Sequence, residues 1–191
     1  MTGGVVNRGD GRCSRGIRRR AALLSAALRV AERSGIAAVG LRSVAREGGT
    51  TPSLVGYHFP DRAVLLESLS YYTAARFEAR ASEVAAGSAD RLEVLAAVIA
   101  DTSGPSRSRA LVEYELALLA ARGTDPPETD LGWPRLLARA VRRTTEDPLV
   151  ASRVTDEIEG LRFRAATGPD RLRAHEVLER IEQILAPRRA S

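Results

Sequence analysis

The feature that most constrains this chain is a pair of short helical segments between residues 41 and 59, which read LRSVAREGGTTPSLVGYHF. In the first segment, one face of a helix is outlined by apolar residues at positions i, i+3 and i+4, which are Leu41, Val44 and Ala45. The pair Gly48-Gly49 follows, and glycine adopts the left-handed backbone of a helix C-terminus at the lowest cost. We therefore predict a helix over residues 41–47.

A second helix start comes directly after the glycine pair. Thr51 offers a hydroxyl that can cap a helix, and Pro52 is a residue favoured at the first helical position. The second helix is predicted over residues 52–58. Two helices joined by a short turn with glycine form a helix-turn-helix, whose second helix usually lies in a DNA major groove. A helical corner that only packs has the same spacing, so that alternative stays open.

The distribution of charge favours the DNA-binding alternative. Residues 1–62 hold 11 Arg and 4 acidic residues, a net charge of +7, whereas residues 63–191 hold 18 Arg and 20 acidic residues, a net charge of −2. A basic first third on a nearly neutral remainder is typical of a nucleic-acid-binding domain attached to a larger body.

The same stretch resembles the DNA-binding domain of the tetracycline-repressor (TetR) family of transcriptional regulators. The resemblance is carried by the pattern Leu41-Arg42-x-Val44-Ala45-x-x-Gly48-Gly49-x-Thr51, followed by Leu54-Val55-x-Tyr57-His58-Phe59-x-x-Arg62-x-x-Leu65-Leu66. It extends back through the helix predicted from Arg18 to Ser34 and covers about the first third of the chain. The sequence departs from the family at three positions. Gly56 stands where the family commonly has a phosphate-contacting Tyr, Gly40 stands where it usually has a Thr that caps the second helix, and Arg62 stands where it has a Lys.

The helix-turn-helix motif and the resemblance together assign candidate DNA contacts. The exposed first turn of the second helix reaches base edges in this motif, which points to Thr51, Pro52, Ser53 and Leu54. By resemblance, Arg42 is a base or phosphate contact, and its guanidinium suits the guanine O6 and N7 atoms. Phosphate contacts are expected from Tyr57, His58 and Arg62. A hydrogen bond inside the domain is the alternative role for His58.

Helical periodicity and turn signals continue to the C-terminus, and the chain shows no run of strand alternation, so the predicted fold class is all-α. A long helix is expected from Asp61 to Ala86 as the connector between the DNA-binding head and the body. Four or five further helices are expected in the body, with a loop at 124–130, and the approximate ranges are 90–102, 107–122, 131–145, 147–168 and 170–185.

The last two of these helices carry apolar stripes at spacings of three and four. The resemblance implies that this helix pair joins a second copy in a four-helix bundle, so the chain is expected to form a homodimer. The expected interface residues are Val154, Ile158, Leu161, Leu178, Ile181 and Leu185. The alternative, that both stripes face the chain's own core, stays open.

The resemblance also implies a body that holds a small-molecule effector. Candidate lining residues are the large side chains of the middle body helices, Tyr114, Trp133 and Phe163, for which plain core packing is the alternative. The expected organisation is a disordered basic arm at 1–17, a helix-turn-helix DNA-binding domain at 18–64 and a ligand-binding and dimerisation domain at 65–191.

Enzyme chemistry is not expected. The sequence holds two His and one Cys, far apart, and no nucleotide-binding or hydrolase motif. The acidic pairs Glu113/Glu115 and Glu157/Glu159 are spaced i, i+2, which places the two members on different faces of a helix, and we interpret them as solvent-exposed charge. No cofactor or metal is predicted, and no apolar run is long enough to span a membrane.

The leading hypothesis is therefore a cytoplasmic, nucleoid-associated and dimeric regulator. It is expected to repress transcription from a palindromic double-stranded DNA operator until a small-molecule effector releases it. The alternative is a dimeric helix-turn-helix protein that responds to a protein partner or is constitutive.

Overall fold

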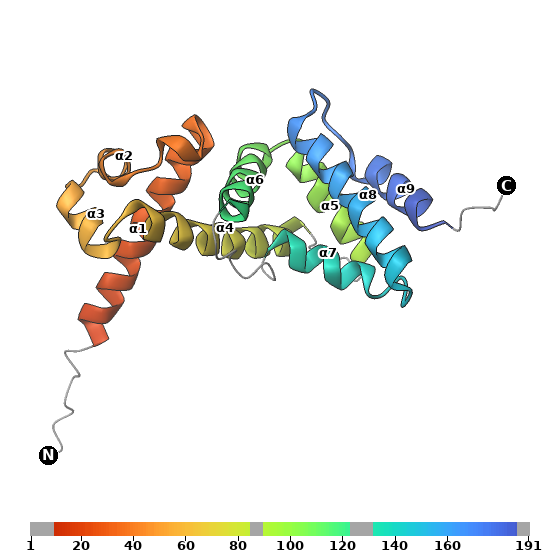
Figure 1. Ribbon diagram of the computed structural model, residues 1–191, viewed down its shortest axis with the longest axis horizontal. Coiled ribbons are helices and arrows are strands. Elements are labelled where there is room, and N and C mark those ends of the chain that lie inside the picture. Colours follow the sequence, from red (N-terminus) through yellow and green to blue (C-terminus); the bar gives the residue numbers. More distant parts are fainter. Residues whose placement is uncertain (1–9, 85–89, 123–131, 187–191) are drawn as a thin grey trace, which may run out of the picture. The chain divides into compact units, whose positions relative to one another are not determined.

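The computed structural model describes residues 10–84, 90–122 and 132–186, which contain helices and no strand. The predicted all-α fold class is confirmed (Figure 1). The chain divides into two compact units, residues 1–69 and residues 70–191. The elements in chain order are α1 (Asp10–Ser34), the 3-10 turn η1 (Ile36–Ala38), α2 (Leu41–Glu47), α3 (Pro52–His58), α4 (Arg62–Val84), α5 (Arg91–Thr102), α6 (Arg107–Ala121), α7 (Trp133–Val141), α8 (Pro148–Thr167) and α9 (Ala174–Leu185).

The helix-turn-helix is confirmed with the predicted bounds of both helices. Gly49 has φ +61°, the left-handed backbone that the end of α2 requires. The next amide, that of Thr50, donates to the Ala45 carbonyl at 2.9 Å and closes the helix end. At the start of α3, the Thr51 hydroxyl accepts from the Leu54 amide at 3.3 Å. The local signals for the end of one helix and the start of the next thus act as predicted.

The first helix begins earlier than predicted, at Asp10 instead of Arg18. The Arg18 guanidinium donates to the Ser14 carbonyl at 3.4 Å and to the Ser14 hydroxyl at 3.0 Å. This contact between residues four apart stabilises a turn that low apolar periodicity did not reveal. The prediction of disorder is therefore wrong for residues 10–17, and the remainder of the predicted arm, 1–9, lies outside the described residues.

The core of the first unit is built from α1, α2, α3 and the first turns of α4. The apolar face predicted on α1 is buried, as are the inner residues of the helix-turn-helix. These core residues include Leu24, Ala27, Leu28, Ala31, Val44, Ala45, Val55, Phe59, Leu65 and Leu69. The packing fixes α3 on α2 and leaves the opposite face of α3 exposed.

Capping contacts set the ends of the remaining helices. The Asp61 carboxylate accepts from the Val64 amide at 2.9 Å and caps α4, as expected. Helix α9 begins at Ala174 and not near residue 170, because the Glu176 carboxylate accepts from the Arg173 amide at 2.9 Å and forms the cap there. The predicted end of the connector at Ala86 and the predicted loop at 124–130 lie outside the described residues.

The second unit has one apolar core, in which α5 contacts α7, α8 and α9 (Figure 1). Both predicted stripes of the last two helices face this core. Ile158 is 1% exposed, and Val154, Leu161 and Ile181 are equally buried. Leu178 and Leu185 are half-buried and pack against the same core.

The predicted dimer contacts are therefore wrong for the four buried residues. A side chain that is enclosed by its own chain has no surface left for a partner. The physical reason is that α8 and α9 turn their apolar faces toward α5. Periodicity in the sequence shows that a face is buried, but it does not show which element covers it.

Candidate DNA-binding surface and effector cavity

The surface of the helix-turn-helix presents most of the predicted DNA contacts to solvent. Arg42, Thr51, Pro52 and Ser53 are exposed, and Leu54 is half-buried. Arg42 lies in the first turn of α2, where the Ser43 hydroxyl accepts from the Gly40 amide at 2.9 Å. Ser43 thus satisfies the Gly40 amide, which is one of the two bonds of a capping box, and helps to define the start of α2.

The C-terminal part of α3 exposes an aromatic pair. Tyr57 is 81% exposed, and its ring meets the His58 ring edge-on with 5.2 Å between centroids. His58 is half-buried and also lies against Phe59, at 6.4 Å between ring centroids. A Cβ atom placed on Gly56 would meet no atom within 4 Å. The position at which TetR-like sequences commonly carry a Tyr therefore has space for a Cβ atom in this chain.

Arg62 has a structural role that the sequence did not indicate. Its guanidinium donates to the Val39 carbonyl at 2.8 Å and to the Ile36 carbonyl at 2.9 Å. Both carbonyls belong to the segment between α1 and α2, which Arg62 ties to the start of α4. The predicted phosphate contact would have to come from its remaining N–H groups.

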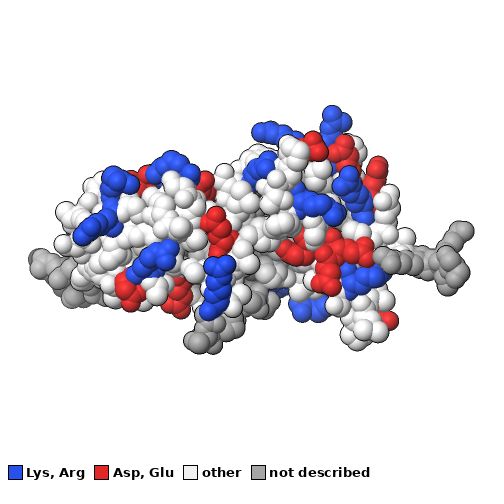
Figure 2. Space-filling model, turned by 45° about the horizontal axis from the view of Figure 1, so that its top comes forward, with Lys and Arg blue, Asp and Glu red and all other residues white. Residues whose placement is uncertain are grey.

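Part of the basic charge of the first unit is paired internally. The Glu47 carboxylate accepts from Arg29 at 2.8 Å and from Arg33 at 2.9 Å. The hydrogen bonds from Arg29 and Arg33 lower the pKa of Glu47. Figure 2 shows basic and acidic side chains interspersed over one face of the molecule. Arg29 and Arg33 are thus partly neutralised within the unit, and the +7 of residues 1–62 already includes the opposing charge of Glu47.

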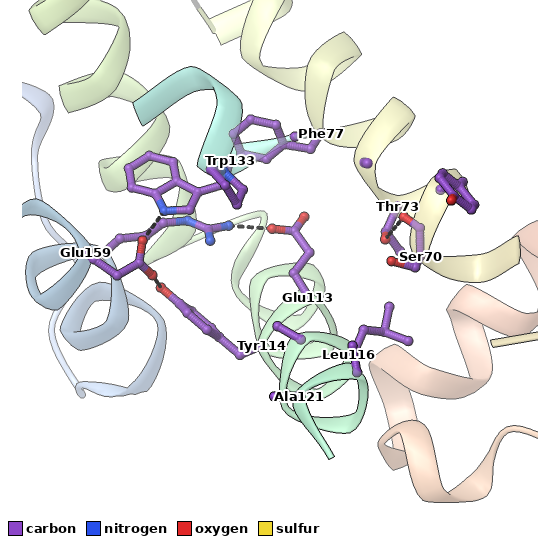
Figure 3. Close-up of a pocket in the computed structure, with 16 residues that line it drawn as sticks. Ser70, Thr73, Phe77, Glu113, Tyr114, Leu116, Ala121, Trp133 and Glu159 are labelled. Carbon is purple, nitrogen blue, oxygen red and sulfur yellow. Dashed lines mark hydrogen bonds and ion pairs between the residues drawn. The ribbon is translucent and has the colours of Figure 1, made fainter. Parts of the chain in front are cut away.

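A cavity of about 320 Å³ lies in the second unit, between residues of α4, α6, α7 and α8. Its walls are mostly apolar and aromatic, which is typical of small-molecule sites. Tyr114 and Trp133, two of the three predicted residues, line it. Figure 3 shows the lining side chains, which include Ser70, Thr73, Phe77, Glu113, Leu116, Ala121 and Glu159.

One carboxylate of the cavity is held by two neutral donors. The Tyr114 hydroxyl donates to Glu159 Oε1 at 2.7 Å, and the Trp133 indole N–H donates to Glu159 Oε2. In Figure 3 the Glu159 carboxylate lies between the indole and the phenol. Burial raises the pKa of the Tyr114 hydroxyl above its ordinary value, so the hydroxyl stays protonated even in alkaline solution.

A buried ion pair forms another part of the wall. Arg162 is 3% exposed and donates to Glu113 Oε2 at 2.5 Å. Its guanidinium lies 4.6 Å from the Trp133 ring centroid and 5.2 Å from that of Tyr114. Burial raises the pKa of Glu113, an effect that the charge and hydrogen bond of Arg162 oppose. The cavity wall thus already stabilises one cation by aromatic rings and a carboxylate.

The third predicted cavity residue, Phe163, is not in the lining. It is 50% exposed and meets the Tyr114 ring edge-on, with 5.3 Å between centroids. Glu159 and Arg162 are three residues apart and share a face of α8. Because Phe163 follows Arg162 directly, it points about 100° around the helix from that face.

The interpretation of the acidic pairs as solvent-exposed charge is wrong for one member of each pair. Glu113 and Glu159 both line the cavity. The i, i+2 spacing correctly separates each from its neighbour in the sequence, but it carries no information on partners 45 to 49 residues away. Nothing in the local sequence distinguishes Glu113 from Glu115.

Two absences hold for the described ranges 10–84, 90–122 and 132–186. They contain no group of three or more His, Cys, Asp or Glu residues placed to hold a metal ion. None of the helices in these ranges combines the length and the apolar character needed to cross a membrane.

Comparison with known proteins identifies the family of the first unit. Residues 23–69 match the model described as bacterial regulatory proteins, tetR family. The chain carries a DNA-binding domain of the TetR family. With this domain it is a DNA-binding transcriptional regulator, and the matched segment contains every candidate DNA contact named above.

Solved structures support the TetR fold over nearly the whole chain. A transcriptional regulator of Streptomyces coelicolor A3(2) is 26% identical, with a TM-score of 0.67, and the match covers 89% of this chain and 99% of that one. The multidrug binding protein EbrR, solved with ethidium, is 24% identical, with a TM-score of 0.66 and coverage of 87% and 96%. A regulator of Saccharomonospora viridis, solved with choline, is 20% identical, with a TM-score of 0.68 and coverage of 88% and 95%. No curated protein matches the chain.

The TetR family model ends at residue 69, where the first compact unit also ends. The cavity lies wholly in the second unit, whose lining residues begin at Ser70. In this chain the DNA-binding surface and the cavity are therefore built from separate parts of the sequence.

Proposed function

We propose that this chain is a repressor that leaves its operator when a small molecule occupies the cavity of the second unit. The observation that carries the proposal is the cavity itself, about 320 Å³ with aromatic walls and a few convergent polar groups. Two proteins of similar fold were solved with a small molecule bound. Repression, ligand response and dimerisation in this chain belong to the proposal.

In the proposed complex, the exposed turn around the start of α3 reads bases, and Arg42 joins it from α2. Ser53 can donate to or accept from a base edge, and the Leu54 side chain offers apolar contact to a thymine methyl group. Tyr57 and His58 contact phosphates, which position the domain without reading the sequence. Arg62 contacts a phosphate only through the N–H groups that do not bind the Val39 and Ile36 carbonyls.

The proposed route of coupling is helix α4. It supplies Leu65 and Leu69 to the core of the first unit, and it supplies Thr73 and Phe77 to the cavity wall of the second unit. A ligand that displaces the cavity side of α4 would act on a helix that also supplies residues to the core of the DNA-binding unit. Linkage then requires that operator DNA and effector weaken each other by the same factor.

We also propose a homodimer formed by the exposed faces of α8 and α9, not by their buried stripes. Gly160 lies on α8 in a shallow groove with Arg153, Arg164 and Gln183. A Cβ atom at Gly160 would meet no atom within 4 Å in the single chain. A large side chain there fits the monomer but would collide with a helix of a second copy packed on this groove.

The dimer is tested with Gly160→Tyr, because the open space leaves the fold of the monomer intact. We expect half the wild-type mass by light scattering and loss of binding to a palindromic site, with the same circular dichroism spectrum. Leu149→Tyr, on another exposed part of α8, is the matched control and should change neither property. A Gly160→Tyr protein with wild-type mass would place the interface elsewhere.

The whole proposal is tested with an operator recovered by genomic pull-down. Fluorescence anisotropy measures operator affinity, and a thermal-shift screen of metabolites finds effectors, since a ligand at 100 times its Kd stabilises the protein by about 2.7 kcal/mol. The expected result is a hit that binds the second unit and weakens operator binding. If the operator is bound and every hit leaves its affinity unchanged, control by a protein partner or constitutive binding replaces the proposal.

A further inference from the structure

We propose that the effector is an organic cation with an apolar or aromatic body, and that Glu159 is its counter-ion. This inference rests on the proposed function of the cavity and specifies the class of ligand. It is carried by the charge balance of the cavity wall, by the hydrogen bonds of Glu159 and by the aromatic rings around them.

The lining holds two carboxylates and one guanidinium, so its charged side chains carry one negative charge in excess. The ionisable lining residues of the cavity are Glu113, Glu159 and Arg162, apart from the phenols of two tyrosines. Arg162 is bound to Glu113 at 2.5 Å, so this pair is neutral as a unit. Among the described residues, no cationic side chain forms an ion pair with Glu159. The cavity therefore carries a formal charge of −1.

The hydrogen bonds of Glu159 hold its carboxylate in place without neutralising it. Tyr114 and Trp133 each donate to one oxygen, and both donors are uncharged. Each carboxylate oxygen has further lone pairs, so Glu159 can accept from a ligand without breaking either bond. A charge fixed before binding needs little reorganisation when a cation arrives.

The aromatic side chains suit a cation as well. Phe77 and Trp133 meet edge-on with 6.4 Å between ring centroids, and Tyr71 and Tyr114 also line the cavity. Ring faces attract alkylammonium and planar aromatic cations, most strongly when water is excluded. The position of the Arg162 guanidinium, 4.6 Å from the Trp133 ring centroid and 5.6 Å from that of Phe77, shows this preference within the chain itself.

An anionic ligand has no comparable site. The one cation of the lining, Arg162, is 3% exposed and already bound to Glu113. Its Nε atom lacks a hydrogen-bond partner but is enclosed, so a ligand could reach it only after the side chain moved. A carboxylate ligand would therefore enter a negatively charged cavity without a free partner.

The test uses three probes with one phenyl ring and different charge, namely benzyltrimethylammonium, 3-phenylpropanol and 3-phenylpropionate. Trp133 is the single tryptophan of the chain and lines the cavity, so its fluorescence reports binding directly and without DNA. We expect the cation to bind at least tenfold more tightly than the alcohol, and the carboxylate to bind most weakly. Equal affinity for the three probes, tighter binding of the carboxylate, or no fluorescence change with the cation up to millimolar concentrations would overturn the inference.

The role of Glu159 is tested with Glu159→Gln, which keeps the shape and one acceptor oxygen but removes the charge. The affinity for the cation should fall tenfold or more, while the affinity for the alcohol should stay within twofold and show that the cavity is intact. Glu157→Gln removes a charge from the same helix outside this cavity and should leave all three affinities unchanged. A Glu159→Gln protein that keeps the preference for the cation would exclude Glu159 as the counter-ion.

Operator binding separates this inference from the proposed function. If the cation binds the cavity but does not weaken operator binding, the ligand class stands and the proposed release mechanism fails. If instead an uncharged or anionic effector from the metabolite screen releases the operator, the mechanism stands and the ligand class fails.

Discussion

Removal of the Arg162 guanidinium, in the variant Arg162→Met, should strongly destabilise the second unit. Methionine is unbranched and apolar and fills much of the same space, so the main effect is electrostatic. The change leaves the Glu113 carboxylate, whose side chain is 16% exposed, without its ion-pair partner, and only the more distant charge of Arg109 still favours its ionised form. Breaking a buried pair from one side typically costs about 3–5 kcal/mol, because the remaining charge is neither paired nor hydrated.

The cost should depend on pH in a defined direction. Burial already raises the pKa of Glu113 in the wild type, and loss of Arg162 should raise it further. When the pKa of a carboxyl is higher in the folded state than in the unfolded state, the folded protein binds the proton more tightly. The free energy of unfolding is then highest at low pH, where the carboxyl is protonated, and falls as the pH rises through the folded-state pKa. Arg162→Met should therefore be most destabilising at and above neutral pH, and less so near pH 5.

The free energy of unfolding in urea is measured at neutral pH and near pH 5. The proteins compared are the wild type, Arg162→Met, Glu113→Gln and the double variant, which together form a double-mutant cycle. Arg162→Met/Glu113→Gln should recover at least half of the loss at neutral pH, because it leaves no buried charge. Arg33→Met breaks an exposed pair with Glu47 and should cost less than about 1 kcal/mol. A loss for Arg162→Met that equals this control, or that does not change with pH, would refute the assignment of a buried ion pair.

Three further predictions concern the stability of the two units. Gly56→Ala should stabilise the protein by about 0.5–1 kcal/mol, because glycine is a poor helix residue and the added methyl group meets no atom within 4 Å; a lower urea midpoint would contradict this. Ile158→Ala should cost about 2–5 kcal/mol of unfolding free energy, as a core truncation, and should leave the mass by light scattering unchanged, since Ile158 is 1% exposed. The lowered pKa of Glu47 means that its contribution to stability is present above its unfolded-state pKa and is lost as the pH falls below it. Acid unfolding of Glu47→Gln, followed by circular dichroism, should therefore depend less on pH in this range than that of the wild type.

The sequence alone determined the helix-turn-helix because its signals are local. The glycine pair after Glu47 and the Thr51-Pro52 start act within one or two turns of the backbone, so they can be recognised without knowledge of the tertiary contacts. The observed bounds of α2 and α3 agree with the predicted ones for this reason. The start of α1 was missed because a side-chain contact between Arg18 and Ser14 leaves no apolar pattern to detect.

The tertiary structure alone decided which element each face meets. The stripe through Ile158 and Ile181 showed that two faces are buried, but only the packing of α8 and α9 on α5 showed that the chain's own core covers them. A stripe of the same period serves a core or a partner equally well, since the hydrophobic effect does not distinguish one apolar surface from another. The prediction of the dimer contacts failed at this point.

The cavity depended on the tertiary structure even more strongly. Tyr114 and Trp133 could be named from the sequence because large aromatic side chains are usually buried somewhere. Glu159 and Arg162 could not be named, because their partners lie 26 to 49 residues away along the chain. Charged residues on a helix are solvated unless distant elements enclose them, and the fold of the second unit alone brings α4, α6, α7 and α8 around these two side chains.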